Sequence, residues 1–321
     1  MRRLESALGV LLASGLLVGC RCEAEDDHPS VPVPLPSARE PQSSLPLLEL
    51  AKQARRRGNA EYQAPSPQER EEYGEWVRAV TKSGWSDRLP TKLPPQGFQG
   101  RLGGDGELWV FAEHPRHKRG GGFVAIRPGS GRALVVEAPH TFYDAGTLEI
   151  ALRVFHELKA RAFLANTMHR GGTGTKQERQ RAALSGESDF DVAHNPATYF
   201  GAAHKVLIEL DPGLLVVQIH GFADDSAPGV DAIVSAALTS GDARGLARAI
   251  QQTTDARARA YPDEINVLGA TTNVQARVCR DARMPFLSIE LSRSFRQLLA
   301  SDEDLLHRFV QSLGTVVESP P

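Results

Sequence analysis

The segment Ala133-Leu-Val-Val-Glu-Ala-Pro-His140 joins a short apolar run to a histidine that follows it closely. The same order recurs in Leu214-Leu-Val-Val-Gln-Ile-His220, and the segment Pro285-Phe-Leu-Ser-Ile-Glu290-Leu carries a glutamate in a similar run. Short apolar runs rich in β-branched residues are typical of strands that are buried on both faces of an α/β sheet. Because ligands of such sheets bind at the carboxyl ends of the strands, we expect both imidazoles at one edge of the sheet.

The chain on either side of these segments has a regular order of strand and helix patterns. Strand patterns at 108–113, 122–127 and 133–138 are joined by glycine-rich turns, which predicts antiparallel hairpins at one side of the sheet. Beyond them, helical patterns at 147–160, 196–210 and 242–260 alternate with strand patterns at 161–167, 214–220, 232–238 and 286–291. This alternation predicts an α/β fold with a mixed, mainly parallel sheet that helices cover.

Residues 1–19 have the composition of a secretory signal peptide. Arg2 and Arg3 precede an apolar stretch, 7–17, that is too short to span a bilayer as a stable helix. The following Leu17-Val-Gly-Cys20 resembles a bacterial lipobox. That resemblance implies cleavage before Cys20 and a lipid on its sulfur. The protein would then be exported and anchored to a membrane of the bacterial cell envelope, on its periplasmic or extracellular side. The competing prediction is an ordinary secreted protein.

Residues 20–65 are predicted to be a disordered tether, because they are acidic and then rich in proline and serine. A helical pattern near Leu47 favours one short helix within it. The remaining residues, 66–321, suit one α/β domain. A formal net charge of −2 gives no reason to expect a nucleic-acid partner. Of the three cysteines, Cys22 and Cys279 are not expected to pair, since the first of them lies in the tether.

His140, Asp144 and His220 form a candidate metal site. His140 and Asp144 follow one strand closely enough to turn toward the same ion, and His220 would supply a distant third ligand. Zinc accepts imidazole nitrogen and carboxylate oxygen, and catalytic zinc sites keep one position for water. A Zn²⁺ cofactor would activate that water, and Glu290 would be the catalytic base that takes its proton. The sequence therefore predicts a metal-dependent hydrolase.

These residues also have structural interpretations. A lone histidine at the end of a strand is more often structural than a ligand. Asp144 could equally cap the helix that follows it. Glu290 could instead pair with Arg283 or Arg293, since a buried carboxylate without a partner is costly. The metal-site interpretation is favoured because two histidines occupy matched positions beside a glutamate on a similar strand.

Four short motifs resemble N-formylglutamate amidohydrolase-like proteins. They are Pro139-His140 after a strand, a helix with Tyr199 and His204, Gln218-Ile-His220-Gly-Phe222 and Ser288-Ile-Glu290-Leu-Ser-Arg293. Together they span roughly residues 133–300. The resemblance implies a phosphorylase/hydrolase-like sheet and a zinc hydrolase that cleaves amide bonds. It makes His140 and His220 zinc ligands and Glu290 the general base.

The order of histidine, acid, histidine and late glutamate also resembles the zinc carboxypeptidases. Those enzymes leave two residues between the first histidine and a glutamate ligand, whereas three residues separate His140 from Asp144 here. Because of this departure, the identity of the acidic ligand stays open, and Glu137 and Glu149 are the alternatives to Asp144. Strand alternation points Glu137 away from His140.

Candidate substrate-binding residues flank the predicted site. Arg170 and Arg293 could each bind a carboxylate in a bidentate way, and His194 and Asn195 lie in a loop that could line the pocket. We expect a small-molecule or peptide substrate, such as an N-acyl amino acid, whose amide or peptide-like bond is cleaved at the cell envelope. Two alternatives are a non-catalytic ligand-binding lipoprotein on the same fold and a metal-dependent esterase or deacetylase of envelope polysaccharide.

Overall fold

The computed structural model of this chain describes residues 44–54, 64–82, 98–103, 108–113, 122–127, 129, 131–172, 174–185 and 188–318. The predicted signal peptide 1–19, Cys20 and Cys22 lie outside these residues, as does most of the predicted tether 20–65. In the described ranges, no helix has both the length and the apolar composition that a membrane span requires.

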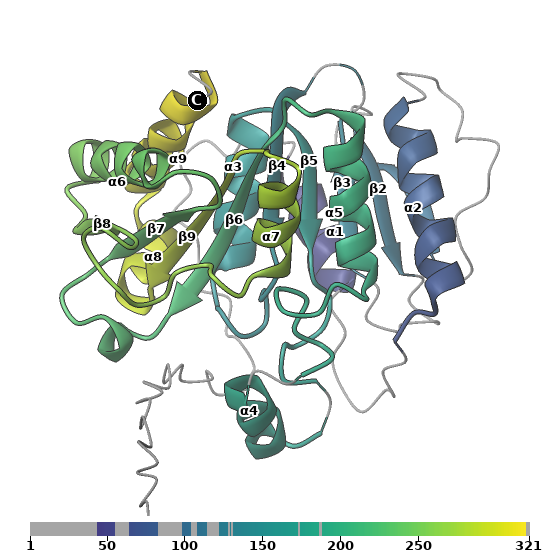
Figure 1. Cartoon of the computed structure of the whole chain (residues 1–321), viewed down its shortest axis with the longest axis horizontal. Coiled ribbons are helices and arrows are strands. Elements are labelled where there is room, and N and C mark those ends of the chain that lie inside the picture. The colour runs from purple at the N-terminus through teal and green to yellow at the C-terminus, as the bar shows by residue number, and fades with distance from the viewer. Residues whose placement is uncertain are drawn as a thin grey trace, which may run out of the picture.

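A mixed β-sheet runs through the centre of the molecule (Figure 1). In the described residues its strands are β1 (Phe98–Gly103), β2 (Leu108–Glu113), β3 (Phe123–Ile126), β4 (Arg132–Ala138), β5 (Ala160–Ala165), β6 (Leu215–Phe222), β7 (Ala232–Ala236), β8 (Ala258–Ala260) and β9 (Phe286–Ser292). They lie in the order β1-β2-β3-β5-β4-β6-β9-β7-β8. β5, β4, β6 and β9 are parallel and form the centre, whereas β1 to β3 form an antiparallel side and β7 runs antiparallel to β9. The predicted α/β fold with a mixed sheet and a parallel core is confirmed.

Two details of the predicted strand arrangement are wrong. β4 does not form a hairpin with β3, because β5 lies between them and pairs with both. β4 is instead an interior strand between β5 and β6, and its residues from Leu134 to Ala138 are buried. In addition, β1 and β8 are strands that the sequence pattern did not predict, and β8 lies within the helical pattern predicted at 242–260.

Helices cover both faces of the sheet. In the described residues they are α1 (Ser44–Ala54), α2 (Pro67–Lys82), α3 (Thr147–Glu157), α4 (Lys176–Ser185), α5 (Tyr199–Leu210), α6 (Ser240–Thr254), α7 (Val274–Asp281), α8 (Arg293–Ser301) and α9 (Glu303–Glu318). The two main clusters of buried apolar side chains place α1, α3, α6, α8 and α9 on one face and α2, α5 and α7 on the other. α4 lies apart from the sheet (Figure 1).

Helix α1 lies within the predicted tether 20–65. It is the short helix predicted near Leu47, and its Leu47, Ala51 and Ala54 are buried in the same apolar cluster as α3. Apolar residues at this spacing form one stripe along a helix, which is stable when a second surface covers it. Residues 44–54 therefore pack with the domain that was predicted to begin at 66.

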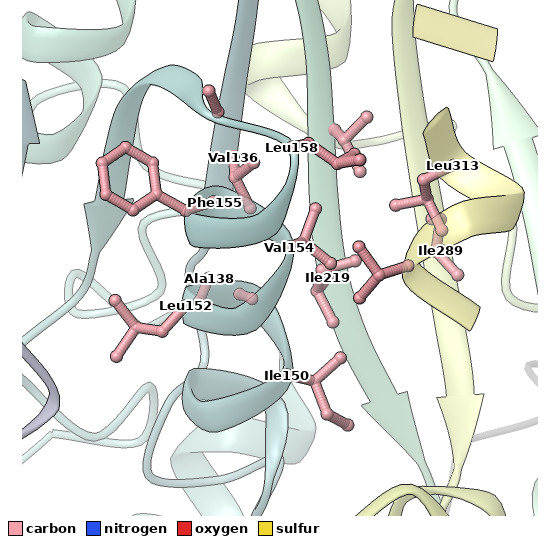
Figure 2. Close-up of a cluster of buried hydrophobic side chains, with 14 of the residues drawn as sticks. Val136, Ala138, Ile150, Leu152, Val154, Phe155, Leu158, Ile219, Ile289 and Leu313 are labelled. Atoms are coloured by element: carbon pink, nitrogen blue, oxygen red, sulfur yellow. The ribbon is translucent and has the colours of Figure 1, made fainter. Parts of the chain in front are cut away.

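The apolar face of α3 packs on the central strands (Figure 2). Val154 and Phe155 of α3 belong to one buried cluster with Val136 of β4, Ile219 of β6 and Ile289 of β9. Burying one such side chain fully contributes about 1.5–3 kcal/mol relative to leaving it exposed. This packing fixes the carboxyl ends of β4, β6 and β9, which is where the candidate site lies.

Candidate metal centre

The structure brings His140, Asp144 and His220 together at the carboxyl ends of β4 and β6. The Nδ1 atoms of His140 and His220 lie 3.2 Å apart, and Asp144 Oδ2 lies 3.4 Å from His140 Nδ1. One potential ligand atom from each residue falls within 4.8 Å of the others, and all three side chains are buried. This is the convergence that their positions in the sequence predicted.

The outer nitrogens of both imidazoles are held by acceptors. His140 Nε2 lies 2.9 Å from Asp191 Oδ1, and His220 Nε2 lies 2.6 Å from Gln218 Oε1. Each Nε2 therefore carries the hydrogen in the neutral ring, which leaves both Nδ1 atoms with a lone pair. Two lone pairs that face each other across 3.2 Å repel each other unless a proton or a metal cation lies between them. The donor set suits Zn²⁺, because it offers two imidazole nitrogens with fixed outer partners and one carboxylate.

The pKa values of the two histidines are shifted in opposite directions. Burial and the Arg170 guanidinium lower the pKa of His140, but Asp191 and Asp144 outweigh them and raise it to about 9. Burial and the positive charge of His140 lower the pKa of His220 to about 3. The pair therefore accommodates one positive charge at neutral pH, which a metal cation would replace with release of a proton.

Asp144 lies beside the two histidines and does not cap helix α3. Its Oδ2 accepts a hydrogen bond of 3.0 Å from the backbone of Gly221, next to His220. The N-cap of α3 is Gly146, with φ of 87° and no side-chain cap. Burial raises the pKa of Asp144, but the hydrogen bond with His140 and the charge of Arg296 hold it below the ordinary value. Asp144 is therefore a carboxylate at neutral pH.

The two alternative acidic ligands lie elsewhere. Glu137 pairs with His204 and accepts a hydrogen bond from Gln218, below the site. Glu149 lies on α3, and its carboxylate lies 3.9 Å from Lys52 Nζ with both side chains substantially exposed. Asp144 is thus the acid that the structure groups with the two histidines.

Glu290 faces the same space from the neighbouring strand. It lies directly opposite His220 in the β6–β9 register, and its Oε1 is 3.9 Å from His220 Nδ1. Its side chain is 17% exposed, which is more than the side chains of His140, Asp144 and His220. Burial and the Asp144 carboxylate raise the pKa of Glu290 to about 8. Glu290 therefore faces the imidazole of His220, and the competing prediction that it pairs with Arg283 or Arg293 stays a prediction.

Asp191 joins several of the predicted residues. One oxygen binds His140, and the other lies 2.6 Å from Arg170 Nη2 and 3.1 Å from His194 Nδ1. Arg170 also lies over the ring of Tyr143, 5.3 Å from its centroid. Arg170 and His194 are therefore beside the metal-site residues, and Asp191 holds both of them.

The other two predicted substrate-binding residues have different surroundings. Asn195 donates to the carbonyl of Asp189 and accepts from the backbone of Ala197, so its amide stabilises its own loop. Arg293 is the first residue of α8, three positions after Glu290, and is partly buried. A substrate role for Arg293 and Asn195 stays a prediction.

Three buried side chains in or beside the site have contacts that the sequence analysis did not predict. Gln218 lies two positions before His220, so strand alternation alone puts both side chains on one face and could have identified it. Glu137 was considered only as a ligand, although it is aligned with Gln218 in the β4–β6 register. Asp191 had no comparable signal, because a loop brings it to His140 across 51 positions of the chain.

Gly221 is required by the close approach of Arg296. The buried Arg296 side chain donates to the carbonyls of Ala145, at 2.8 Å, and Leu291, at 2.6 Å. A Cβ added at Gly221 would lie 1.9 Å from Arg296 Nη1. The backbone of Gly221 also binds Asp144, so any shift here would reach the metal-site residues.

Gly221→Ala is therefore expected to lower the free energy of unfolding by about 1–3 kcal/mol, the cost typical of overpacking a core. Urea denaturation of the purified variant measures this. Gly245→Ala is the matched control: this glycine is exposed on α6, and an added Cβ has no neighbour within 4 Å. Alanine there should stabilise the protein by up to about 1 kcal/mol. Equal stability of the two variants would contradict the assignment of Gly221.

No protein-family model and no curated protein matches the chain. Solved structures resemble its fold at low identity. An N-formylglutamate amidohydrolase from Ralstonia eutropha JMP134, the class that the four sequence motifs resemble, is 13% identical with a TM-score of 0.41, over 62% of this chain and 98% of that one. A bacteriophage poly-gamma-glutamate hydrolase is 13% identical with a TM-score of 0.39, over 61% and 89%. A succinylglutamate desuccinylase from Chromobacterium violaceum is 11% identical with a TM-score of 0.37, over 77% and 74%. Likenesses of this size assign no function, which has to come from the geometry of the site.

Proposed function

We propose that this chain is a metal-dependent hydrolase that cleaves an amide or peptide-like bond. The observation that carries the proposal is the pair of Nδ1 atoms 3.2 Å apart, beside Asp144, with both outer imidazole nitrogens held by acceptors. His140, Asp144 and His220 would hold Zn²⁺. Bound there, the ion would polarise the substrate carbonyl and lower the pKa of a water molecule.

Glu290 supplies the proton transfer that amide hydrolysis needs. Its carboxylate faces the ligand group from β9 and is partly open to solvent. In the ionised form it takes a proton from the attacking water, and it then passes that proton to the nitrogen of the leaving amine as the carbon–nitrogen bond breaks. The carboxyl product receives the oxygen of the water, so the reaction is balanced without another reactant.

The substrate class is proposed from the positive side chains near the site. Arg170 contacts Asp191, which lies beside the three proposed ligands. Arg293 is the first residue of α8, directly after the strand β9 that carries Glu290. Guanidinium groups bind carboxylates in a bidentate way, which favours an N-acyl amino acid or a peptide. The lipobox-like Leu17-Val-Gly-Cys20 supports the further proposal that the protein acts at the bacterial cell envelope, anchored by lipid.

The test combines metal content with a substrate panel. Purified protein should contain about one zinc ion per chain, hydrolyse N-acyl amino acids or short peptides, lose the activity to a chelator and regain it with added Zn²⁺. An O-acetylated sugar assayed in parallel tests the esterase alternative. Hydrolysis of the sugar alone would favour that alternative. If the protein binds no metal and cleaves neither substrate, the proposal is overturned. The alternative of a non-catalytic binding lipoprotein then remains.

A further inference from the structure

A chain of buried polar contacts leads away from His220 into the core. His220 Nε2 donates to Gln218 Oε1 at 2.6 Å, and Gln218 Nε2 donates to Glu137 Oε2 at 2.8 Å. The other oxygen of Glu137 accepts from His204 Nδ1 at 2.7 Å, and His204 Nε2 lies 3.6 Å from Cys279 Sγ. All of these side chains are buried, and they come from β6, β4, α5 and α7.

Glu137 and His204 form a buried ion pair. Burial lowers the pKa of His204, but the Glu137 carboxylate beside it outweighs this and raises the pKa to about 10. His204 is therefore an imidazolium at neutral pH and can donate from both nitrogens. Replacing a buried ion pair by apolar residues of similar volume is often neutral or stabilising, so stability alone does not account for this pair. Its geometry offers a different account.

The ion pair fixes the direction of the Gln218 amide. An ionised carboxylate only accepts hydrogen bonds, so Gln218 has to present its NH₂ group to Glu137. Its carbonyl then faces the opposite way, where it accepts from both His220 Nε2 and Asn273 Nδ2, each at 2.6 Å. Because that partner is an acceptor, His220 carries its hydrogen on Nε2 and presents the lone pair of Nδ1 to His140 and Asp144.

We propose that Glu137 is a positioning residue that fixes the tautomer of His220 through Gln218, without touching the metal or the substrate. This role deepens the proposed function and rests on it, because the lone pair of Nδ1 matters only if the site binds a cation. The same logic gives Asp191 a parallel position on His140, but there the carboxylate contacts the imidazole directly.

Two substitutions at Glu137 separate hydrogen bonding from charge. Glu137→Leu removes the acceptor for Gln218 Nε2, so the side-chain amide of Gln218 is free to flip and exchange the positions of its oxygen and its NH₂ group. Glu137→Gln keeps a carbonyl that can accept from Gln218, while its NH₂ group can donate to a neutral His204. We expect Glu137→Leu to weaken Zn²⁺ binding by about 10–100-fold, the range typical of outer partners of metal ligands, and Glu137→Gln to restore affinity close to that of the wild type.

Two measurements test this on the purified full chain. Zinc affinity is obtained by competition with a chromophoric chelator. The tautomer of His220 is read from ¹⁵N chemical shifts of the imidazole in the metal-free protein, where the wild type and Glu137→Gln should show Nε2–H and Glu137→Leu a mixture. Cys279→Ala is the matched control. It changes the end of the series of buried polar contacts that is farthest from His220 and leaves the Glu137–Gln218 hydrogen bond in place, so its zinc affinity should equal that of the wild type.

Glu137→Leu leaves His204 without its partner and could unfold the protein. The double variant Glu137→Leu/His204→Leu removes both charges at once and keeps the core apolar, so it provides a folded test of the same idea. Full zinc affinity and an unchanged Nε2–H tautomer in this folded variant would overturn the positioning role. If wild-type protein binds no zinc, the proposed function fails, whereas the tautomer of the metal-free protein still decides the role of Glu137.

Discussion

His220→Ala is expected to remove the bound metal and, with it, hydrolysis. His220 would contribute one of three protein ligands, and catalytic zinc sites keep three such ligands plus water. His140 and Asp144 alone would hold the ion too weakly to retain it through purification. The loss of affinity should exceed the roughly 10–100-fold that follows removal of an outer partner. Metal per chain, measured by mass spectrometry, and kcat/KM on an N-acyl amino acid together check this expectation.

The control for His220→Ala is His307→Ala. His307 lies on α9, is largely exposed and bonds to Glu157, away from β4 and β6. Its replacement should leave both metal content and kcat/KM unchanged. Folding of both variants is checked by thermal denaturation in the presence of chelator, because bound metal adds to the apparent stability of the wild type. A folded His220→Ala protein that retains a full equivalent of zinc and its activity would end the metal-site assignment.

The pairing of His140 with His220 was predictable because it depends on strand order alone. Apolar runs ahead of each histidine mark interior strands, and parallel neighbours bring their carboxyl ends to one edge. β4 and β6 are adjacent in the sheet, so the prediction held even though the expected hairpin of β3 and β4 was wrong. The local sequence could not show that β5 inserts between those two strands, since that pairing is decided by long-range packing.

The position of Asp144 beside the two histidines was less predictable. An aspartate just past a strand and just before a helix suits a ligand and a helix cap equally well. The sequence could not choose between them, because the choice depends on the backbone of Gly221, which lies 77 positions away and binds Asp144. Strand alternation did place Glu137 correctly, away from His140. That same direction lets Glu137 reach His204 on α5, which the periodicity of α5 alone did not reveal.

Glu290→Gln is expected to keep the metal and lose the chemistry. Glutamine preserves the size of the side chain on β9, and Glu290 does not belong to the group of His140, Asp144 and His220 that could hold the ion. What disappears is the group that takes a proton from water and returns it to the leaving nitrogen. General acid–base catalysis typically contributes about 10²–10⁴-fold, so kcat should fall by that factor while metal content stays near one per chain.

The two readouts on this variant distinguish a base from a ligand. If Glu290 bound the metal directly, its replacement would lower zinc content together with activity, as expected for His220→Ala. If Glu290 were only a structural partner of His220, kcat would change little and the free energy of unfolding would change instead. Glu72→Gln, an exposed substitution on α2, controls for the loss of one negative charge and should leave kcat, zinc content and stability at wild-type values. A large loss of kcat with zinc retained therefore assigns Glu290 to the chemical step, because neither a ligand nor a structural residue gives that combination.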